Sequence, residues 1–172
     1  MLKIIGSLMV VVSTTWIGFF YSSNLNKRNN QLKEFQRCIY QLQNEIIYTY
    51  TPLPEVFLSI SKKSKVPMDK FFNELSRILY SNEVDSVYEG IKKAYEGMED
   101  ILNFNKEDLN LIYNLGKGLG ETDIEGQKKV VALTLDNLKS QLIEAETLVK
   151  KNVKMYRFLG FTIGMMVVII FI

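Results

Sequence analysis

The sequence predicts an all-α protein: an antiparallel six-helix cytoplasmic bundle whose two long helices continue into N- and C-terminal transmembrane segments. Three observations predict this class. Uncharged apolar stretches stand at both ends of the 172-residue chain, a polar segment lies between them, and its apolar residues recur at helical spacing. No segment alternates apolar and polar residues over more than a few positions, so we expect no sheet. The predicted domains are residues 1–21 and 158–172 as transmembrane helices and residues 22–157 as a cytoplasmic helical domain.

The first apolar stretch is long enough to cross a membrane as a helix. It runs from Ile4 to Tyr21 without a charged residue, and these residues would rise roughly 27 Å, against about 30 Å of hydrocarbon in a bilayer. A cleaved signal peptide is the alternative. Its positive region would contain only Lys3, however, and no small-residue cleavage site follows Val12. We therefore expect an uncleaved anchor.

The second apolar stretch is shorter. Phe158 to Ile172 carries no charge and would rise only roughly 22 Å as a helix. A full crossing requires Met155 and Tyr156 to contribute, while the neighbouring basic side chains extend toward the headgroups. A shallow or tilted insertion is the alternative.

Basic residues concentrate on the inner flanks of the two stretches, whereas the outer flanks offer only Lys3. The inner basic residues are Lys27, Arg28, Lys33, Arg37, Lys139, Lys150, Lys151, Lys154 and Arg157. Because cytoplasmic flanks of membrane helices carry an excess of Lys and Arg, we expect the middle domain in the cytoplasm and both termini across the membrane.

Two long helices frame the middle domain. In the first, an apolar stripe ends before Pro52 and Pro54, and it consists of Leu32, Phe35, Ile39, Leu42 and Ile46. In the last, Thr122 and Glu125 predict a capping box at the start. A heptad stripe follows it, comprising Ile124, Val131, Leu135, Leu138, Leu142, Ala145 and Val149.

Four shorter helices are expected between the long ones, because proline, glycine and capping residues divide this segment. Their expected ranges are 54–64, 67–81, 86–103 and 106–115. Asn105 is the expected N-cap of the last of these, with Asp108 at the third helical position.

The composition argues against an enzyme. The chain has no histidine, which removes the commonest general base and metal ligand at neutral pH, and its single cysteine, Cys38, has no partner for a disulfide. A net charge of +2 without a basic, aromatic-rich run argues against nucleic-acid binding. Gly116-Lys117-Gly118 lacks the ending of a phosphate-binding loop. We expect no catalytic residues, no cofactor and no metal site.

Small residues in the two apolar stretches predict close helix packing. Gly160 and Gly164 stand four positions apart, as do Thr14 and Gly18, and small residues at this spacing let helix backbones approach. In an antiparallel hairpin the two pairs reach similar depths, so we expect these four residues to lie in contact. The alternative is that they face lipid or another copy of the chain, which would make the protein a homo-oligomer.

Two bends carry a candidate docking surface. It consists of Glu55, Glu121, Asp123 and Gln127. Acids in a first helical turn interact favourably with the helix dipole, so fold requirements explain part of this pattern. Both bends fall where the long antiparallel helices end, which would place the exposed acids together at the tip of the domain farthest from the membrane.

Several short motifs together resemble a known family. They are Thr14-Thr15-Trp16 with Gly18, Glu45-Ile46 with Tyr48, Thr51-Pro52-Leu53-Pro54-Glu55, Leu119-Gly120, Asp123 and Gly126-Gln127. In this order they resemble the stage III sporulation protein AB family, and the similarity runs from end to end. The resemblance implies a component of the mother-cell membrane apparatus of endospore-forming bacteria, with a helical head similar to the cytoplasmic domains of F-type platform proteins of type II secretion.

The resemblance also implies partners and a location. The expected function is a non-enzymatic, two-pass platform in the mother-cell membrane facing the forespore, which docks a cytoplasmic sporulation ATPase and acts with membrane channel components. The alternative is a two-pass membrane signalling or interaction scaffold without an ATPase partner.

Overall fold

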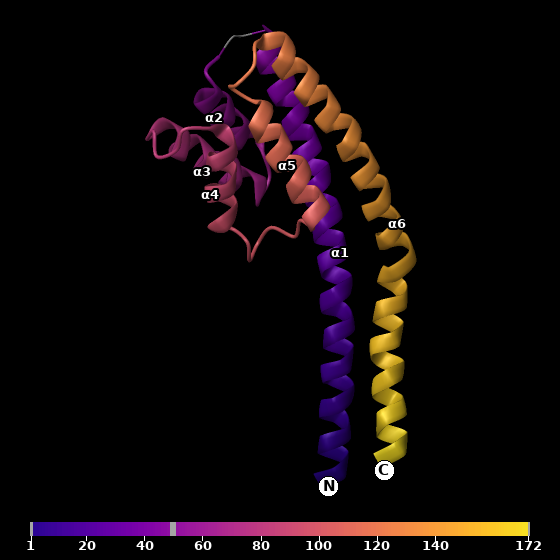
Figure 1. The fold of residues 1–172 in the computed structure, drawn as a ribbon. Helices are drawn as coiled ribbons and strands as arrows, with labels where there is room; N and C mark the ends of the chain where they lie inside the picture. Colours follow the sequence, from indigo (N-terminus) through magenta and orange to yellow (C-terminus); the bar gives the residue numbers. More distant parts are fainter. Residues whose placement is uncertain (1, 49–50, 172) are drawn as a thin grey trace. The chain divides into compact units, whose positions relative to one another are not determined.

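The computed structural model describes residues 2–48 and 51–171, apart from the side-chain surroundings of residues 2–5, 7, 8, 47, 48, 157, 160, 161, 170 and 171. These residues form six helices and no strand (Figure 1). The helices are α1 (Leu2–Tyr48), α2 (Leu53–Lys63), α3 (Met68–Tyr80), α4 (Val87–Glu96), α5 (Lys106–Gly118) and α6 (Ile124–Phe171). The predicted all-α class is confirmed.

The chain divides into two compact units. Residues 30–142 form one, called here the head unit, which contains α2 to α5 and one part each of α1 and α6. Residues 1–29 and 143–172 form the other, called here the terminal unit.

The core of the head unit forms on the stripe that the first long helix was predicted to present. Leu32, Phe35, Ile39 and Leu42 are each at most 1% exposed. In the head unit, α2 packs on α3, α3 on α4 and α4 on α5, and Figure 1 shows these four helices gathered beside the head part of α1. Phe72 of α3 joins three elements, because its ring stacks on Phe35 of α1 and on Phe57 of α2, with centroids 6.1 and 5.9 Å apart.

Glycines set the closest helix approaches in this core. A Cβ added to Gly116 of α5 would lie 2.8 Å from Ile91 Cδ1 and 3.0 Å from Tyr88 Cα, both on α4. A Cβ on Gly118 would meet the Val130 side chain of α6 at 2.5 Å. Glycine at these positions therefore lets α5 lie against both neighbours.

One helix is shorter than the sequence predicted. A helix was expected over residues 86–103, but α4 ends at Glu96, and Gly97 begins an irregular connection. The Gln31 side chain of α1 fixes this connection, because its Nε2 donates to Ile101 O at 2.9 Å and its Oε1 accepts from Asn103 N at 2.7 Å. Tertiary hydrogen bonds therefore replace the helical ones expected there.

The start of the last helix also differs from the prediction. The prediction of a capping box formed by Thr122 and Glu125 is wrong. Helix α6 begins at Ile124, and Asp123 Oδ1 accepts a hydrogen bond from Gly126 N at 2.8 Å. The Thr122 hydroxyl instead donates to Gly118 O at 3.1 Å. An aspartate at the N-cap satisfies a free amide and places its charge at the positive end of the helix dipole.

The start of α5 agrees with the prediction. Asp108 N donates to Asn105 Oδ1 at 2.8 Å, and Asn105 N donates to Asp108 Oδ2 at 3.0 Å. This reciprocal pair is a complete capping box. Asp108 is only 1% exposed, so the box also satisfies a buried carboxylate.

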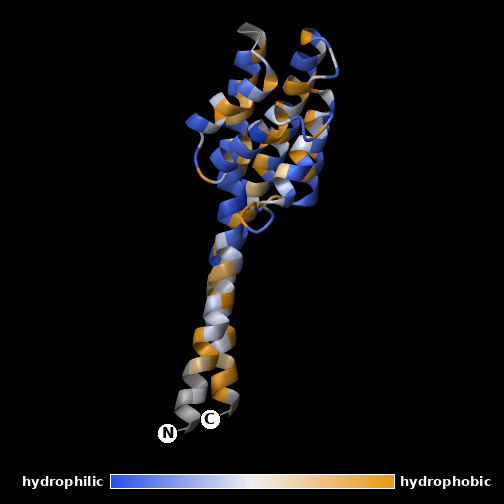
Figure 2. Ribbon diagram, turned by 90° about the vertical axis from the view of Figure 1, so that its left-hand side faces the viewer, coloured by the Kyte–Doolittle hydropathy of each residue, from blue (hydrophilic) through white to orange (hydrophobic). Residues whose placement is uncertain are grey.

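In the terminal unit, the two chain ends run antiparallel. The rings of Tyr21 and Tyr156 stack with centroids 5.8 Å apart, and Thr14 lies against Gly164 farther toward both termini. Figure 2 shows that apolar and weakly polar residues dominate the paired helices of this unit. The buried Arg28 side chain lies 4.0 Å from the Glu144 carboxylate.

Within the part of the chain that the structure describes, no helix combines the length and the hydropathy needed to cross a membrane.

Candidate functional site

A proline corner opens α2 and lies at one end of the head unit. Pro52 occupies the N-cap, and its carbonyl accepts hydrogen bonds from Glu55 N at 2.9 Å and Val56 N at 3.1 Å. Pro54 can stand in the first turn because amides there have no partner within the helix. The Pro54 carbonyl also accepts the Ser76 hydroxyl of α3 at 2.8 Å. The corner is thus fixed to the helix that packs beneath it.

The turn between α5 and α6 packs against this corner. Leu119 is 1% exposed. Gly120 has a φ of +82°, a left-handed conformation that favours glycine. A Cβ added there would lie 3.5 Å from Leu53 Cδ1 and 3.7 Å from Val87 Cγ2. The Leu119-Gly120 motif therefore serves both the turn and its contact with the start of α2.

A hollow of about 360 Å³, called here the tip hollow, opens where three segments meet. Its lining residues are Leu53, Pro54, Leu79, Asn82, Val84, Asp85, Ser86, Val87, Leu119, Gly120 and Glu121. The two carboxylates belong to exposed residues, whereas Val87 and Leu119 are buried. The tip hollow therefore combines apolar walls with acidic residues at its solvent-facing parts.

A second hollow of about 250 Å³ shares Leu53 with the first. Its other lining residues are Ile46, Thr51, Pro52, Ile124 and Gln127. Because Ile46 lies near the end of α1 and Ile124 begins α6, the ends of the two long helices meet here. This is the arrangement expected at one end of an antiparallel pair.

The structure brings together most of the predicted docking residues. Glu121 lines the tip hollow, Gln127 lines the second hollow, and Asp123 lies between them in the sequence as the N-cap of α6. Glu55 is exposed in the first turn of α2 and lines neither hollow. Sequence reasoning missed Asp85 on the turn between α3 and α4, although the acidic run of Glu83 and Asp85 in that turn was a usable signal.

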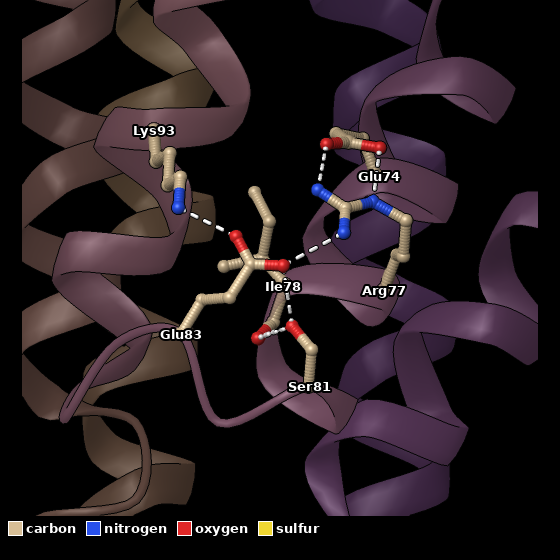
Figure 3. A network of polar contacts seen from close by, with 6 residues as sticks. All are labelled: Glu74, Arg77, Ile78, Ser81, Glu83 and Lys93. Carbon is tan, nitrogen blue, oxygen red and sulfur yellow. Dashed lines mark hydrogen bonds and ion pairs between the residues drawn. The ribbon is translucent and has the colours of Figure 1, made fainter.

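A polar network holds that turn in place (Figure 3). The Glu83 carboxylate accepts hydrogen bonds from Arg77 Nη1 at 2.8 Å, Lys93 Nζ at 2.5 Å and Ser81 Oγ at 2.7 Å. Arg77 also donates to Glu74 at 2.7 Å. The hydrogen bond from Lys93, followed by those from Ser81 and Arg77, lowers the pKa of Glu83 to about 2. Glu83 thus ties α3 to α4 beside the tip hollow.

The small residues of the terminal unit lie where its two helices meet. A Cβ added to Gly164 would clash with the Thr14 hydroxyl and would lie 3.0 Å from Val11 Cα. Gly18 is buried. The structure thus brings Thr14 and Gly164 together, while the surroundings of Gly160 lie outside the described residues.

An apolar hollow of about 380 Å³ lies beside this contact. Its lining residues are Thr14, Ile17, Gly18, Tyr21, Tyr156, Leu159 and Ile163. Gly18 therefore shares one packing region with Thr14.

Groups suited to catalysis are scarce in the described residues. No cluster of three or more acidic, cysteine or histidine side chains there could hold a metal ion. Cys38 is fully buried, its Sγ lies 3.1 Å from Ser64 Oγ, and burial raises the pKa of its thiol to about 11. A thiol with so high a pKa is a poor nucleophile at neutral pH.

Comparison with known proteins identifies the family. The family model described as stage III sporulation protein AB matches residues 3–172. The chain belongs to the stage III sporulation protein AB family. The protein of that name from Bacillus subtilis (strain 168) is 29% identical over 174 residues, which cover 99% of each chain.

A solved structure of a stage III sporulation protein AB also matches. It is 25% identical, with a TM-score of 0.66, and the match covers 72% of this chain and 96% of the other. The family that the sequence motifs resembled is therefore confirmed, and membership gives the chain a sporulation-related role.

Proposed function

We propose that the chain is a non-enzymatic membrane platform of the sporulation apparatus that links mother cell and forespore. In this proposal the terminal unit anchors the protein in the mother-cell membrane facing the forespore. The head unit lies in the cytoplasm and receives an ATPase at the tip hollow, and the platform acts with membrane channel components.

The observation that carries the docking proposal is the convergence of motifs at the tip hollow. Leu53 and Pro54 belong to one motif that carried the family resemblance, and Leu119 and Gly120 belong to another. The chain folds so that both line one hollow of about 360 Å³ beside Glu121. A pocket that combines buried apolar residues with polar and charged groups is suited to hold an apolar anchor from a protein partner while polar contacts select that partner.

The proposal of membrane anchoring is supported by the terminal unit. Residues 4–21 and 158–172 carry no charge. Trp16, Phe158 and Ile169 of this unit are 74%, 70% and 75% exposed. Large apolar side chains exposed in such number mark contact with a membrane or another protein, and the basic inner flanks favour a cytoplasmic head.

Charge reversal at the tip tests ATPase docking. We expect Glu55→Lys with Glu121→Lys to abolish copurification of the ATPase from sporulating cells and to block sporulation. Because both side chains are exposed and no hydrogen bond to either carboxylate is seen in the described residues, circular dichroism should stay near wild type. Thermal melting should fall only slightly, because Glu55 lies in the first turn of α2, where an acid contributes about 0.3 to 1 kcal/mol through the helix dipole.

Asp123 needs a separate control, because its carboxylate caps α6. Asp123→Asn removes the charge but keeps an accepting oxygen, whereas Asp123→Lys removes the cap and costs about 1 kcal/mol of stability.

A correctly folded Glu55→Lys, Glu121→Lys variant that still recovers the ATPase and sporulates would exclude the tip as the docking site.

A scaffold without an ATPase is the second candidate function, and the same purification separates it from the first. Crosslinking the head in sporulating membranes would then recover a regulator and no ATPase.

A separate crosslinking experiment tests for a homo-oligomer. Cysteines at positions 18 and 160 should crosslink within one chain if the terminal unit is a hairpin, and only between chains if these residues form an oligomer contact.

A further inference from the structure

A basic corner joins α2 to α3 in the head unit, at the opposite end of α2 from the tip hollow. It carries four exposed lysines, which are Lys62, Lys63, Lys65 and Lys70. Four lysines against one aspartate, Asp69, leave residues 62–70 with a net charge of +3. None of these lysines forms an ion pair with another described residue.

The corner borders a hollow of about 390 Å³. Lys65, Val66 and Pro67 line one side, and the other side is formed by Asn30, Gln31, Lys33 and Glu34 of α1. Val66 is 69% exposed among these basic residues. An exposed apolar side chain flanked by lysines is the pattern that binds the boundary between lipid headgroups and acyl chains.

The one carboxylate in this hollow is already neutralised. Arg37 Nη2 donates to Glu34 Oε1 at 2.6 Å, and Lys65 N donates to the same oxygen at 2.8 Å. The hydrogen bond from Arg37 is the main reason that the pKa of Glu34 lies below its ordinary value. Arg37 Nη2 also donates to Lys63 O at 2.6 Å. These bonds offset the Glu34 charge and hold the corner against α1, so its lysines are presented by a fixed backbone.

We propose that the basic corner docks on the anionic phosphate headgroups of the membrane in which the chain is anchored. This rests on the proposed membrane insertion. Lys33 lines the same hollow as Lys65 of the corner, and it follows Tyr21, the end of the proposed membrane segment, by 12 residues. These residues cannot span more than about 42 Å even when fully extended. Tethering therefore keeps the corner at a high effective concentration near the lipid surface. Anionic lipids attract lysines there, and the attraction is screened by salt.

The test uses the full chain reconstituted into vesicles of phosphatidylcholine alone or mixed with phosphatidylglycerol. A fluorophore is attached at Val66→Cys, and the lipids carry a headgroup nitroxide that quenches it. Cys38 is buried and does not compete for the label. A matched probe at Tyr80→Cys occupies an exposed site at the other end of α3. We expect quenching at position 66 in the anionic vesicles, less in the neutral ones, and little at position 80.

Charge reversal then identifies the lysines. Each lysine at an anionic surface contributes roughly fivefold to binding, so Lys62→Glu with Lys65→Glu should lower the docking equilibrium by more than about tenfold. Lys92→Glu with Lys129→Glu makes the same change in net charge at two exposed lysines elsewhere in the head unit, and it should leave quenching within about twofold of wild type.

Equal quenching in both kinds of vesicle, or an equal loss in the two double variants, would overturn the proposal. A lack of quenching at position 66 in either kind of vesicle would overturn it as well, and would leave an acidic protein as the partner that fits the corner. Failure of membrane insertion is seen separately. A chain that alkaline carbonate strips from the vesicles was never inserted, and this result would overturn the anchoring and the corner proposal together.

Discussion

Glu83 is the residue whose chemistry gives the clearest dependence of stability on pH. Its pKa is about 2 in the folded protein, below the value of about 4.3 expected in an unfolded chain. A carboxyl with a lowered folded pKa stabilises the protein above its unfolded pKa, and this contribution is lost as the pH falls through the folded value. The contribution of Glu83 should therefore disappear between about pH 4.5 and pH 2.

Replacing Glu83 with glutamine should isolate this contribution. At pH 7 we expect Glu83→Gln to unfold at a lower denaturant concentration than wild type, and we expect the gap to close as the pH approaches 2. The effect is modest and weakens in high salt, because the ion pairs are exposed. Denaturant unfolding of the detergent-solubilised chain measures it, with Glu99→Gln as an exposed control. A gap that stays constant with pH would show that the carboxylate charge is not what holds the turn.

At the scale of the helices, sequence reasoning succeeded where periodicity and local capping act alone. The stripe of Leu32, Phe35 and Ile39 was predicted and is buried, because side chains three or four positions apart share one helix face. The Asn105 cap was also predicted correctly, because its two hydrogen bonds connect residues only three positions apart. The prediction was wrong for α4, where the Gln31 side chain stabilises an irregular connection from a distant part of the sequence. No pattern in the local sequence predicts such a tertiary hydrogen bond.

For the docking residues too, one part of the arrangement could be predicted from the sequence and another part could not. The two bends could be predicted to lie together from the antiparallel order of the long helices, and Glu121 and Gln127 do line adjoining hollows. The acidic run of Glu83 and Asp85 was visible in the sequence, but that Asp85 lines the tip hollow could not be predicted, because it depends on how α3 and α4 pack. The cap of α6 was misassigned between two neighbouring residues that can both accept the hydrogen bond.

The helix contact of the terminal unit makes a prediction at the scale of an element pair. Gly164→Leu should push α6 away from Thr14 and Val11 and lower the stability of the pair by about 1 to 3 kcal/mol, as overpacking does. Gly6→Leu is the matched control, because a Cβ added to Gly6 meets nothing within 4 Å. Thermal melting in detergent compares the two variants. Equal melting temperatures would show that the contact at Gly164 does not hold the helices together.

At the scale of the whole molecule, the proposed topology decides which surfaces can reach which partners. An ATPase could reach the tip hollow only if the head is cytoplasmic, and the proposed docking of the basic corner would then involve the cytoplasmic leaflet, whose surface is negative. Cys38 is an unsuitable reporter of topology, because it is fully buried and its thiol pKa is raised to about 11. A lack of labelling at Cys38 would therefore not show on which side of the membrane the head lies. Tyr80 is 52% exposed in the head unit, lies at the other end of α3 from the basic corner and offers a better site.

The topology can be measured in protoplasts of non-sporulating cells that express the chain, where the far side of the membrane is open to the medium. A membrane-impermeant maleimide should label a cysteine added after Ile172 in intact protoplasts, and it should label Tyr80→Cys only after lysis. The excess of basic residues on the inner flanks is the physical reason. The unsubstituted chain controls for Cys38, which should stay unlabelled in both conditions. Labelling of Tyr80→Cys in intact protoplasts would place the head outside, where neither a cytoplasmic ATPase nor the inner leaflet could reach it.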